Sequence, residues 1–178
     1  MYTADVIRSY SKIIGTPVLI DSIRPVTTVK DLVMDPESGK LIAFVVDINR
    51  KKIIVPMDVL SWHEIIKIHS PADMIALEDV LRVEEVIRSG RKFMKAKVES
   101  KDGVYLGRVQ DIAVNSKSFA IESMFVAKGI AGLLRYGSRI IQAKDIIEVL
   151  EDKIVVKENL RTIKKDNKRV KLEDMALG

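Results

Sequence analysis

The stretch Val29–Val46 places short runs of apolar and β-branched residues on either side of a polar segment, a pattern that predicts two β-strands joined by a tight turn. The polar segment, Asp35-Pro36-Glu37-Ser38-Gly39, has the residue types that a turn requires. Proline presets φ, an aspartate carboxylate can accept hydrogen bonds from nearby backbone N–H groups, and glycine tolerates a positive φ. We therefore expect a β-hairpin here.

The same pattern occurs a second time along the chain. At an offset of 111 − 31 = 80 residues, Val109–Val126 aligns with Val29–Val46, and Val86–Ser89 repeats Val6–Ser9 residue for residue. After Val46 the offset becomes 145 − 58 = 87, so the second copy has seven extra residues before Ile140. Two copies are too few for a solenoid, and the repeat predicts two tandem domains, residues 1–75 and 76–158, followed by a basic C-terminal tail, residues 159–178.

The remaining pattern predicts many short strands and few helices. Helices are expected at Ala4–Ser11 and Leu77–Ser89, and a helical turn at Pro56–Leu60. Besides the hairpin, strands are expected at Pro17–Ile20, Ile23–Thr28, Ile53–Val55, Trp62–Ile68, Lys95–Glu99, Leu106–Asn115, Ala120–Val126, Ser138–Gln142 and Asp152–Lys157. The predicted fold is mainly β: two tandem small β-barrels, each preceded by a short helix.

Composition narrows the function classes. The 178-residue chain has no cysteine, which excludes disulfides, thiolate nucleophiles and zinc–thiolate sites. It has no apolar run of about 18 residues and no start that resembles a secretory signal, so we expect a cytoplasmic protein. The net charge is +5, and residues 157–171 alone carry seven Lys/Arg against two acidic residues, 7 − 2 = +5. The tail is basic, whereas the predicted barrels are not.

Several residue patterns together resemble the PRC-barrel family, named for the H subunit of the photosynthetic reaction centre. They are Gly15 with Val18, Gly107 with Val109 and Asp111, the Asp35–Gly39 turn, and the strand that runs into Val55, Pro56 and Val59. The same barrel is similar to the C-terminal half of a ribosome-maturation factor. The second copy departs from the first with Gly107 in place of Thr27, Phe119 in place of Gly39 and Ala143 in place of Pro56.

The resemblance implies a docking module and not an enzyme. In the reaction-centre subunit this barrel sits on a membrane complex, and in the maturation factor it contacts a ribosomal protein. Because fold alone does not fix function, the choice of partner has to come from sites in this chain.

The first candidate site is the seven-residue insertion within Lys128–Arg139. It places apolar and basic side chains in a glycine-punctuated loop, which suits a surface that binds a protein partner. The candidate partner-binding residues are Ile130, Leu133, Leu134, Arg135 and Tyr136. The alternative is a longer hairpin whose apolar residues fold back to cap the barrel.

The second candidate site is the basic tail. Its cations could bind RNA phosphates or an anionic membrane surface, and the alternative is a solvated terminus. The candidate nucleic-acid-binding residues are Arg161, Lys164, Lys165, Lys168, Arg169 and Lys171. No aromatic residue lies in the tail, so base stacking by the tail is not expected.

Residues of catalytic or metal-ligating type do not form a recognisable constellation. Asp31, Asp35, Asp111 and Asn115 fit turn capping and strand-end hydrogen bonding better than a metal or acid–base site. Hence we expect no catalytic residue, metal or cofactor. The sequence predicts a non-enzymatic adaptor that binds a protein partner, with two alternatives: an RNA- or ribosome-associated assembly factor, and a protein attached to a membrane complex.

Overall fold

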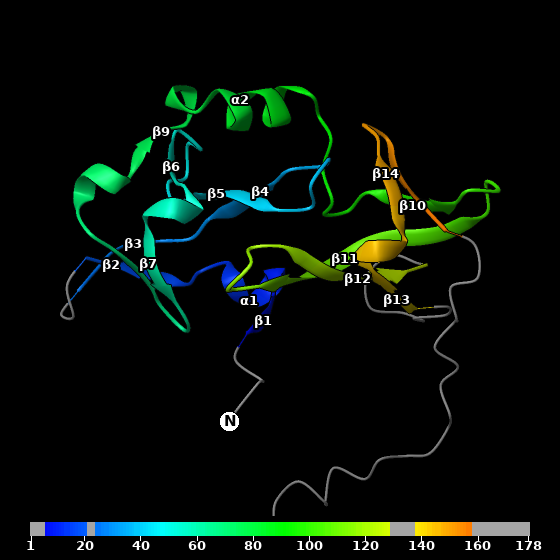
Figure 1. Cartoon of the computed structure of the whole chain (residues 1–178), viewed down its shortest axis with the longest axis horizontal. Helices are drawn as coiled ribbons and strands as arrows, with labels where there is room; N and C mark the ends of the chain where they lie inside the picture. Colours follow the sequence, from blue (N-terminus) through cyan, green and yellow to red (C-terminus); the bar gives the residue numbers. More distant parts are fainter. Residues whose placement is uncertain (1–5, 21–23, 129–137, 158–178) are drawn as a thin grey trace, which may run out of the picture.

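The computed structural model describes residues 6–20, 24–128 and 138–157, and its architecture is mainly β, as predicted (Figure 1). The strands are β1 Ile7–Ser9, β2 Pro17–Leu19, β3 Pro25–Thr28, β4 Asp31–Met34, β5 Leu41–Val45, β6 Lys52–Ile54, β7 Val59–Trp62, β8 Ile66–Ile68, β9 Ile75–Ala76, β10 Lys97–Ser100, β11 Tyr105–Asn115, β12 Ile121–Ala127, β13 Arg139–Gln142, β14 Ile146–Val149 and β15 Lys153–Val156. The helices are α1 Tyr10–Ile13 and α2 Leu81–Arg88, and the 3₁₀ turns are η2 Pro56–Asp58, η3 Pro71–Asp73, η4 Leu77–Asp79 and η5 Ala143–Asp145.

The described strands form three sheets. In the first half of the chain, residues 6–75, one sheet has the order β3-β2-β8-β7, and another has the order β4-β5-β6-β9. In the second half, residues 76–157, a single sheet has the order β13-β12-β11-β10-β15-β14, and β1 also pairs with β11. None of these sheets closes on itself within the described residues, so the predicted closed barrels are not observed there and the sheets are open.

The turn that the sequence predicted between β4 and β5 forms as expected. The Asp35 carboxylate accepts a hydrogen bond from the Glu37 backbone N–H at 3.0 Å, and Gly39 has a φ of 66°. In the second half, Asn115 accepts from the Lys117 N–H at 2.9 Å, and Phe119 has a φ of 57°. The turn geometry is therefore the same in both halves, although a phenylalanine holds the left-handed position in the second.

Two predicted elements are wrong. Within the predicted helix Ala4–Ser11, Ile7–Ser9 is strand β1, because its backbone pairs with the edge of β11, and α1 begins only at Tyr10. The predicted single strand Trp62–Ile68 is a hairpin of β7 and β8, because the chain reverses at residues 63–65. Strand β14 was not predicted at all.

The hydrophobic core is continuous across the two halves. Buried side chains of β2, β5, β7 and β8 form one cluster with those of β10, β11, β12 and β15. Trp62 is 4% exposed, and its ring stacks on Phe119 of the other half with the centroids 5.6 Å apart. Phe44 meets both of these rings edge-on. An aromatic cluster therefore joins the halves in the interior.

The two hairpin turns also meet each other. The Leu41 N–H donates to the Phe119 carbonyl at 2.7 Å, and the Ile121 N–H donates to the Gly39 carbonyl at 2.9 Å. These two bonds are related by the offset of 80 residues, so the halves face each other in a pseudo-twofold arrangement.

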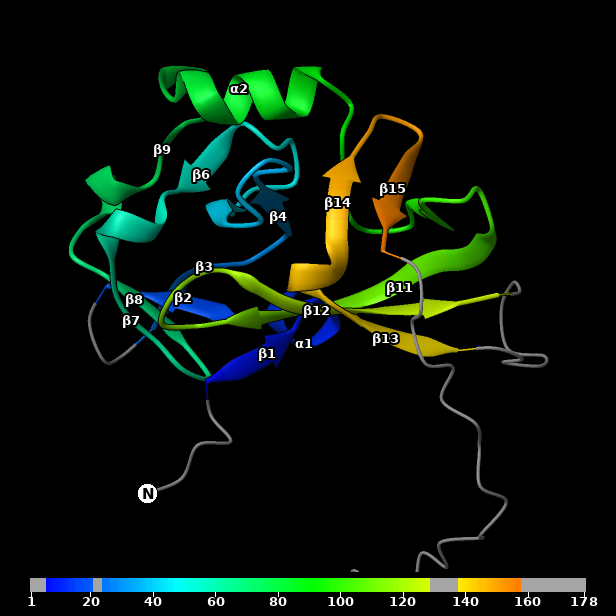
Figure 2. The same ribbon diagram turned by 45° about the vertical axis from the view of Figure 1, so that its right-hand side comes forward.

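Helix α2 belongs to the second half but packs on the first. Figures 1 and 2 both show it lying over β4, β5 and β6. Val83 and Val86 of α2 form a second apolar cluster with the outer face of these strands. In return, β1 of the first half pairs with β11 of the second. The N-terminal segment of each half, β1 in the first and α2 in the second, thus packs on the other half.

Candidate functional site

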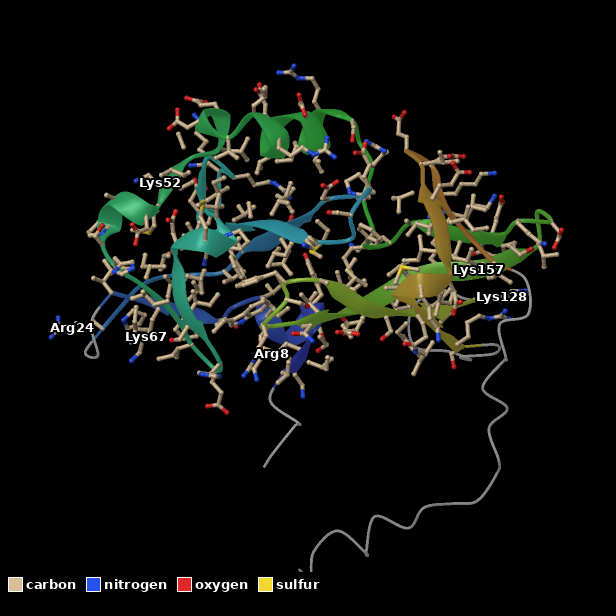
Figure 3. The ribbon with its side chains drawn as sticks, viewed as in Figure 1. Arg8, Arg24, Lys52, Lys67, Lys128 and Lys157 are labelled. Atoms are coloured by element: carbon tan, nitrogen blue, oxygen red, sulfur yellow. The ribbon has the colours of Figure 1, made fainter. Side chains whose placement is uncertain are left out.

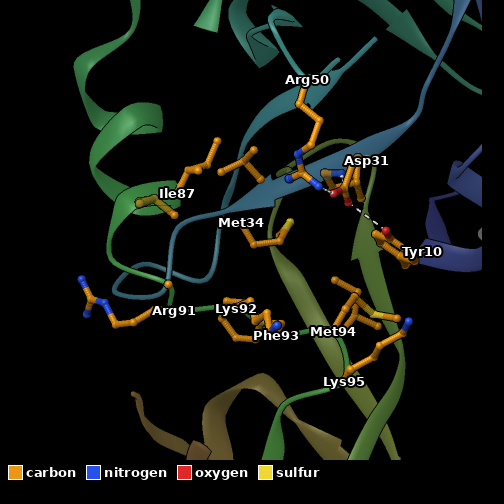
Figure 4. A pocket seen from close by; sticks show the side chains of 15 residues that line it. Tyr10, Asp31, Met34, Arg50, Ile87, Arg91, Lys92, Phe93, Met94 and Lys95 are labelled. Atoms are coloured by element: carbon orange, nitrogen blue, oxygen red, sulfur yellow. Dashed lines mark hydrogen bonds and ion pairs between the residues drawn. The ribbon is translucent and has the colours of Figure 1, made fainter. Parts of the chain in front are cut away.

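A cavity of about 420 Å³ lies where the two halves meet (Figure 4). Its walls come from β4, from the C-terminal end of α2 and from the segment 90–95 that follows α2. Apolar side chains line much of it, among them Met34, Ile87, Phe93, Met94 and Ile112. It is the kind of concave, largely apolar surface with a few polar groups at which small ligands or partner side chains bind.

The polar group in this cavity is built around the Asp31 carboxylate. Its Oδ1 accepts hydrogen bonds from the Tyr10 hydroxyl and from the Leu32 N–H, both at 2.8 Å. Its Oδ2 lies 2.5 Å from the guanidinium Nη1 of Arg50, and Figure 4 shows these three side chains converging. Because both carboxylate oxygens are engaged, Asp31 is not a free general base; it ties α1 to β4.

Burial, together with the hydrogen bond to Asp31, raises the pKa of Tyr10 above the value near 10 that is usual for a phenol. The neutral hydroxyl is therefore the form present at physiological pH. A tyrosine in this state donates a hydrogen bond and does not act as a nucleophile.

The rim of the cavity is basic. Arg91 pairs with Glu37 at 3.1 Å, whereas the side chains of Lys92 and Lys95 have no ion-pair or hydrogen-bond partner among the described residues. This cluster could not be predicted from the sequence, because its members come from separate segments of the chain. The one feature of the sequence that pointed to Asp31 was its recurrence as Asp111 at the offset of 80 residues.

Asp111 has a structural role that parallels the role of Asp31. Its carboxylate accepts hydrogen bonds from the Ser11 hydroxyl at 2.6 Å and from the Ser11 N–H at 3.2 Å. It also accepts from the Ile112 N–H at 2.9 Å. Both aspartates thus bind the N-terminal segment of the chain, and within the described ranges no group of three or more His, Cys, Asp or Glu side chains is placed to hold a metal ion.

The predicted partner-binding residues Ile130, Leu133, Leu134, Arg135 and Tyr136 lie outside the described residues. The residues that flank them are described. Lys128 directly follows strand β12, and its Nζ lies 5.8 Å from the centre of the Tyr105 ring. Arg139 begins β13 and pairs with Val126 of β12. The insertion therefore connects β12 to β13.

The predicted nucleic-acid-binding residues Arg161, Lys164, Lys165, Lys168, Arg169 and Lys171 also lie outside the described residues. Figure 3 shows Lys128 and Lys157, which precede the insertion and the tail, toward the same end of the molecule. Other basic side chains labelled in this view, such as Arg24 and Lys52, lie over different elements. The labelled cations are thus dispersed and do not form one basic face.

Helices that could cross a membrane are not found in the described part of the chain. Residues 5–75 match the family of the PRC-barrel domain. No curated protein matches the chain.

Proposed function

We propose that this protein is a non-enzymatic adaptor that binds a protein partner through PRC-barrel domains arranged in tandem. The observation that carries the proposal is the match of residues 5–75 to the PRC-barrel domain, which is a protein-interaction module. The mainly β architecture of the described residues agrees with such a module.

The proposal includes a second PRC-barrel domain in residues 76–158. Its support is the recurrence of the same backbone pairings in both halves. Strands β2 and β8 pair in parallel through Val18 and Ile66, and β10 and β15 pair in parallel through Val98 and Ile154. The turns η2 and η5 are offset by 143 − 56 = 87 residues, the offset found in the sequence.

A binding role is favoured over catalysis by the chemistry of the cavity. Its only carboxylate among the lining residues, Asp31, is held by Tyr10 and Arg50, and its phenol has a raised pKa. The chain also lacks cysteine, so a thiolate cannot supply a nucleophile. We place this adaptor in the cytoplasm.

The test is affinity capture from host lysate with the tagged chain, with and without RNase, read by mass spectrometry and by RNA content. We expect a protein partner that survives RNase and is lost when Leu133 and Leu134 are both changed to Asp. The matched control is Ile147→Asp, which places a charge at a side chain that is 50% exposed on β14. This control should retain the partner.

The alternative is an RNA- or ribosome-associated factor that uses the basic tail, or a peripheral protein of a membrane complex. Binding through the tail should weaken steeply with salt, because each phosphate contact releases counterions. RNA that co-purifies and disappears when residues 158–178 are removed would replace the adaptor proposal with the RNA-associated one. Capture of neither protein nor RNA would refute both.

A further inference from the structure

Helix α2 covers a specific face of the first half. Strands β4, β5 and β6 present an outer face that points away from the common core, and α2 lies on it. Val83 and Val86 of the helix are 0% and 3% exposed. Beneath them, the strand residues are at most 4% exposed: Val33, Ala43, Val45 and Ile53.

On the corresponding face of the second half, residues 6–20, 24–128 and 138–157 place no helix. At the offsets of 80 and 87 residues its members are Ala113, Ser123, Phe125 and Ile140, on β11, β12 and β13. Phe125 pairs with Ile140, and Ala113 pairs with Ser123, so all four side chains share one face. Ile140 is 49% exposed, whereas its counterpart Ile53 is fully buried.

The described part of the chain supplies no counterpart of α2 for this face. At the offset of 80 the counterpart of Leu81–Arg88 is residues 1–8, of which residues 1–5 lie outside the described residues and Val6–Arg8 repeats Val86–Arg88. However, Ile7–Ser9 is strand β1 and lies along the edge of β11, with Ile7 opposite Asn115. Ile7 is 47% exposed, so β1 extends the apolar stripe and does not cover it. In Figures 1 and 2, α2 lies on one side of the molecule, and β12 and β13 form the outer layer on the opposite side.

We propose that the outer face of β11, β12 and β13 docks a short amphipathic α-helix of a protein partner, in the position that α2 occupies on the first half. This inference rests on the proposed adaptor function and identifies the surface and the kind of partner segment. The helix would bury apolar residues at the spacing of Val83 and Val86 against Phe125 and Ile140. Helix-in-groove recognition of this kind uses apolar anchors at i and i+3 or i+4.

Charged residues at the end of this face indicate which charge the docked helix should carry. Arg82 anchors α2 to the first half through Asp35 at 2.8 Å and Glu37 at 3.0 Å. The corresponding residues of the second half are Asn115 and Lys117. The docked helix should therefore carry an acidic residue where α2 carries Arg82.

The same charge disfavours two other occupants. Helix α2 of a second copy of this chain would bring Arg82 toward Lys117. The segment 159–171 of the chain itself is strongly basic and would be repelled in the same way. A helix of another protein with an acidic first turn meets neither obstacle.

The experiment is site-specific photo-cross-linking of the full-length chain in host cells. The photo-reactive amino acid benzoyl-phenylalanine replaces Ile140 in one variant and Ile147, equally exposed but outside the face, in the control. We expect the variant at 140 to capture a segment of another protein with helical apolar spacing and an acidic residue in its first turn. The control should not capture that segment.

The captured segment is then made as a synthetic peptide and titrated against the full chain. Ile140→Asp should weaken binding about tenfold, as loss of an apolar anchor does. Lys117→Glu should weaken it about two- to fivefold, the range of an exposed charge pair, while Ile147→Asp should change nothing.

Several outcomes would overturn the inference. One is cross-linking at position 140 to residues 1–5, 129–137 or 158–178 of the same chain, or to a second copy. Another is capture of an extended or basic segment. If affinity capture yields a protein partner that Ile140→Asp does not affect and that does not cross-link at position 140, this inference fails and the adaptor function stands. If no protein is captured at all, the adaptor function fails as well.

Discussion

Phe119 holds a backbone conformation that glycine holds in the other half, and this gives a sharp prediction about stability. Its φ of 57° corresponds to 66° at Gly39. A residue with a Cβ atom loses roughly 1 kcal/mol in this left-handed region. The Phe119 ring offsets that cost, because it is half-buried against Trp62 and Phe44.

The magnitudes can be separated with two substitutions. Replacing a fully buried Phe by Ala costs about 3–5 kcal/mol, aromatic pairing included. Since Phe119 is only half-buried, we expect Phe119→Ala to lower the free energy of unfolding by about 2 kcal/mol. Phe119→Gly removes the same ring but also removes the strain, so it should be more stable than Phe119→Ala by about 1 kcal/mol. In a helix or strand the order would be the reverse.

The assay is urea unfolding followed by tryptophan fluorescence. Trp62 is the sole tryptophan and is buried beside residue 119, so its emission reports on this contact directly. At an m value of ~2 kcal/mol/M, the Gly and Ala variants should differ by about 0.5 M in urea midpoint. As a control, Gly39→Ala, where an added Cβ meets no atom within 4 Å, should lose about 1 kcal/mol from strain alone. An Ala variant of Phe119 as stable as the Gly variant would refute the argument.

Three further predictions concern other elements. Gly107→Ala should lower the free energy of unfolding by about 3 kcal/mol or more in a thermal or urea melt, because a Cβ there would lie 2.5 Å from a backbone oxygen of the opposite strand. Gly103→Ala, with open space around it, should cost about 1 kcal/mol. For Asp35, burial opposes ionisation, but the hydrogen bonds from Arg82 and from a backbone N–H outweigh it, so the pKa is lowered and the carboxylate contributes stability above its unfolded pKa of about 3.9. Arg82→Met should therefore lower the urea midpoint at pH 7, and the difference from the unmodified chain should shrink as the pH falls below the unfolded pKa and the Asp35 carboxylate becomes protonated; an undiminished difference in acid would contradict the ion pair. For Tyr10 the pKa is raised, so its phenol should not ionise near pH 10. In a spectrophotometric titration at 295 nm, Tyr10→Phe should therefore keep every ionisation step that the unmodified chain shows near pH 10. The stability that depends on the neutral phenol should be lost only as the pH rises above about 10.

Local turn chemistry was the part of the fold that could be read from the sequence. The residues of Asp35–Gly39 carry their own geometry, since the aspartate, proline and glycine each restrict the backbone without tertiary help. The offset of 80 residues likewise placed Phe119 at the position of Gly39, and the structure shows the same turn there. Mainly β architecture followed from the many short apolar runs.

The candidate site could not be predicted in the same way, because its parts depend on tertiary contacts. The cavity joins Asp31 and Arg50 of the first half to Lys92 and Lys95 of the second, and no local pattern relates these positions. The predicted partner-binding and nucleic-acid-binding residues lie outside the described residues and stay predictions.

The clearest limit of local reasoning is a tetrapeptide that occurs twice. Val-Ile-Arg-Ser runs from the end of helix α2 at residues 86–89, but at residues 6–9 it enters strand β1. Intrinsic propensity is identical in the two places, so the difference must come from what each segment meets. At residues 7–9 the free edge of β11 offers ladder hydrogen bonds, and a short helix is too weak to compete with them.

This difference also explains why the halves are not interchangeable. Because Ile7–Ser9 pairs with β11 as a strand, no helix among the described residues covers the outer face of β11, β12 and β13. The other departures lie in the same three strands: the acidic pair Asp35 and Glu37 becomes Asn115 and Lys117 in the β11–β12 turn, and seven residues are inserted between β12 and β13. A second half that only needed to fold would gain nothing from leaving Ile140 half-exposed, because burying its counterpart Ile53 under a helix contributes roughly 1.5–3 kcal/mol. The half-exposed Ile140, the changed charge of the β11–β12 turn and the longer β12–β13 connection are therefore what we expect of a surface that a partner covers.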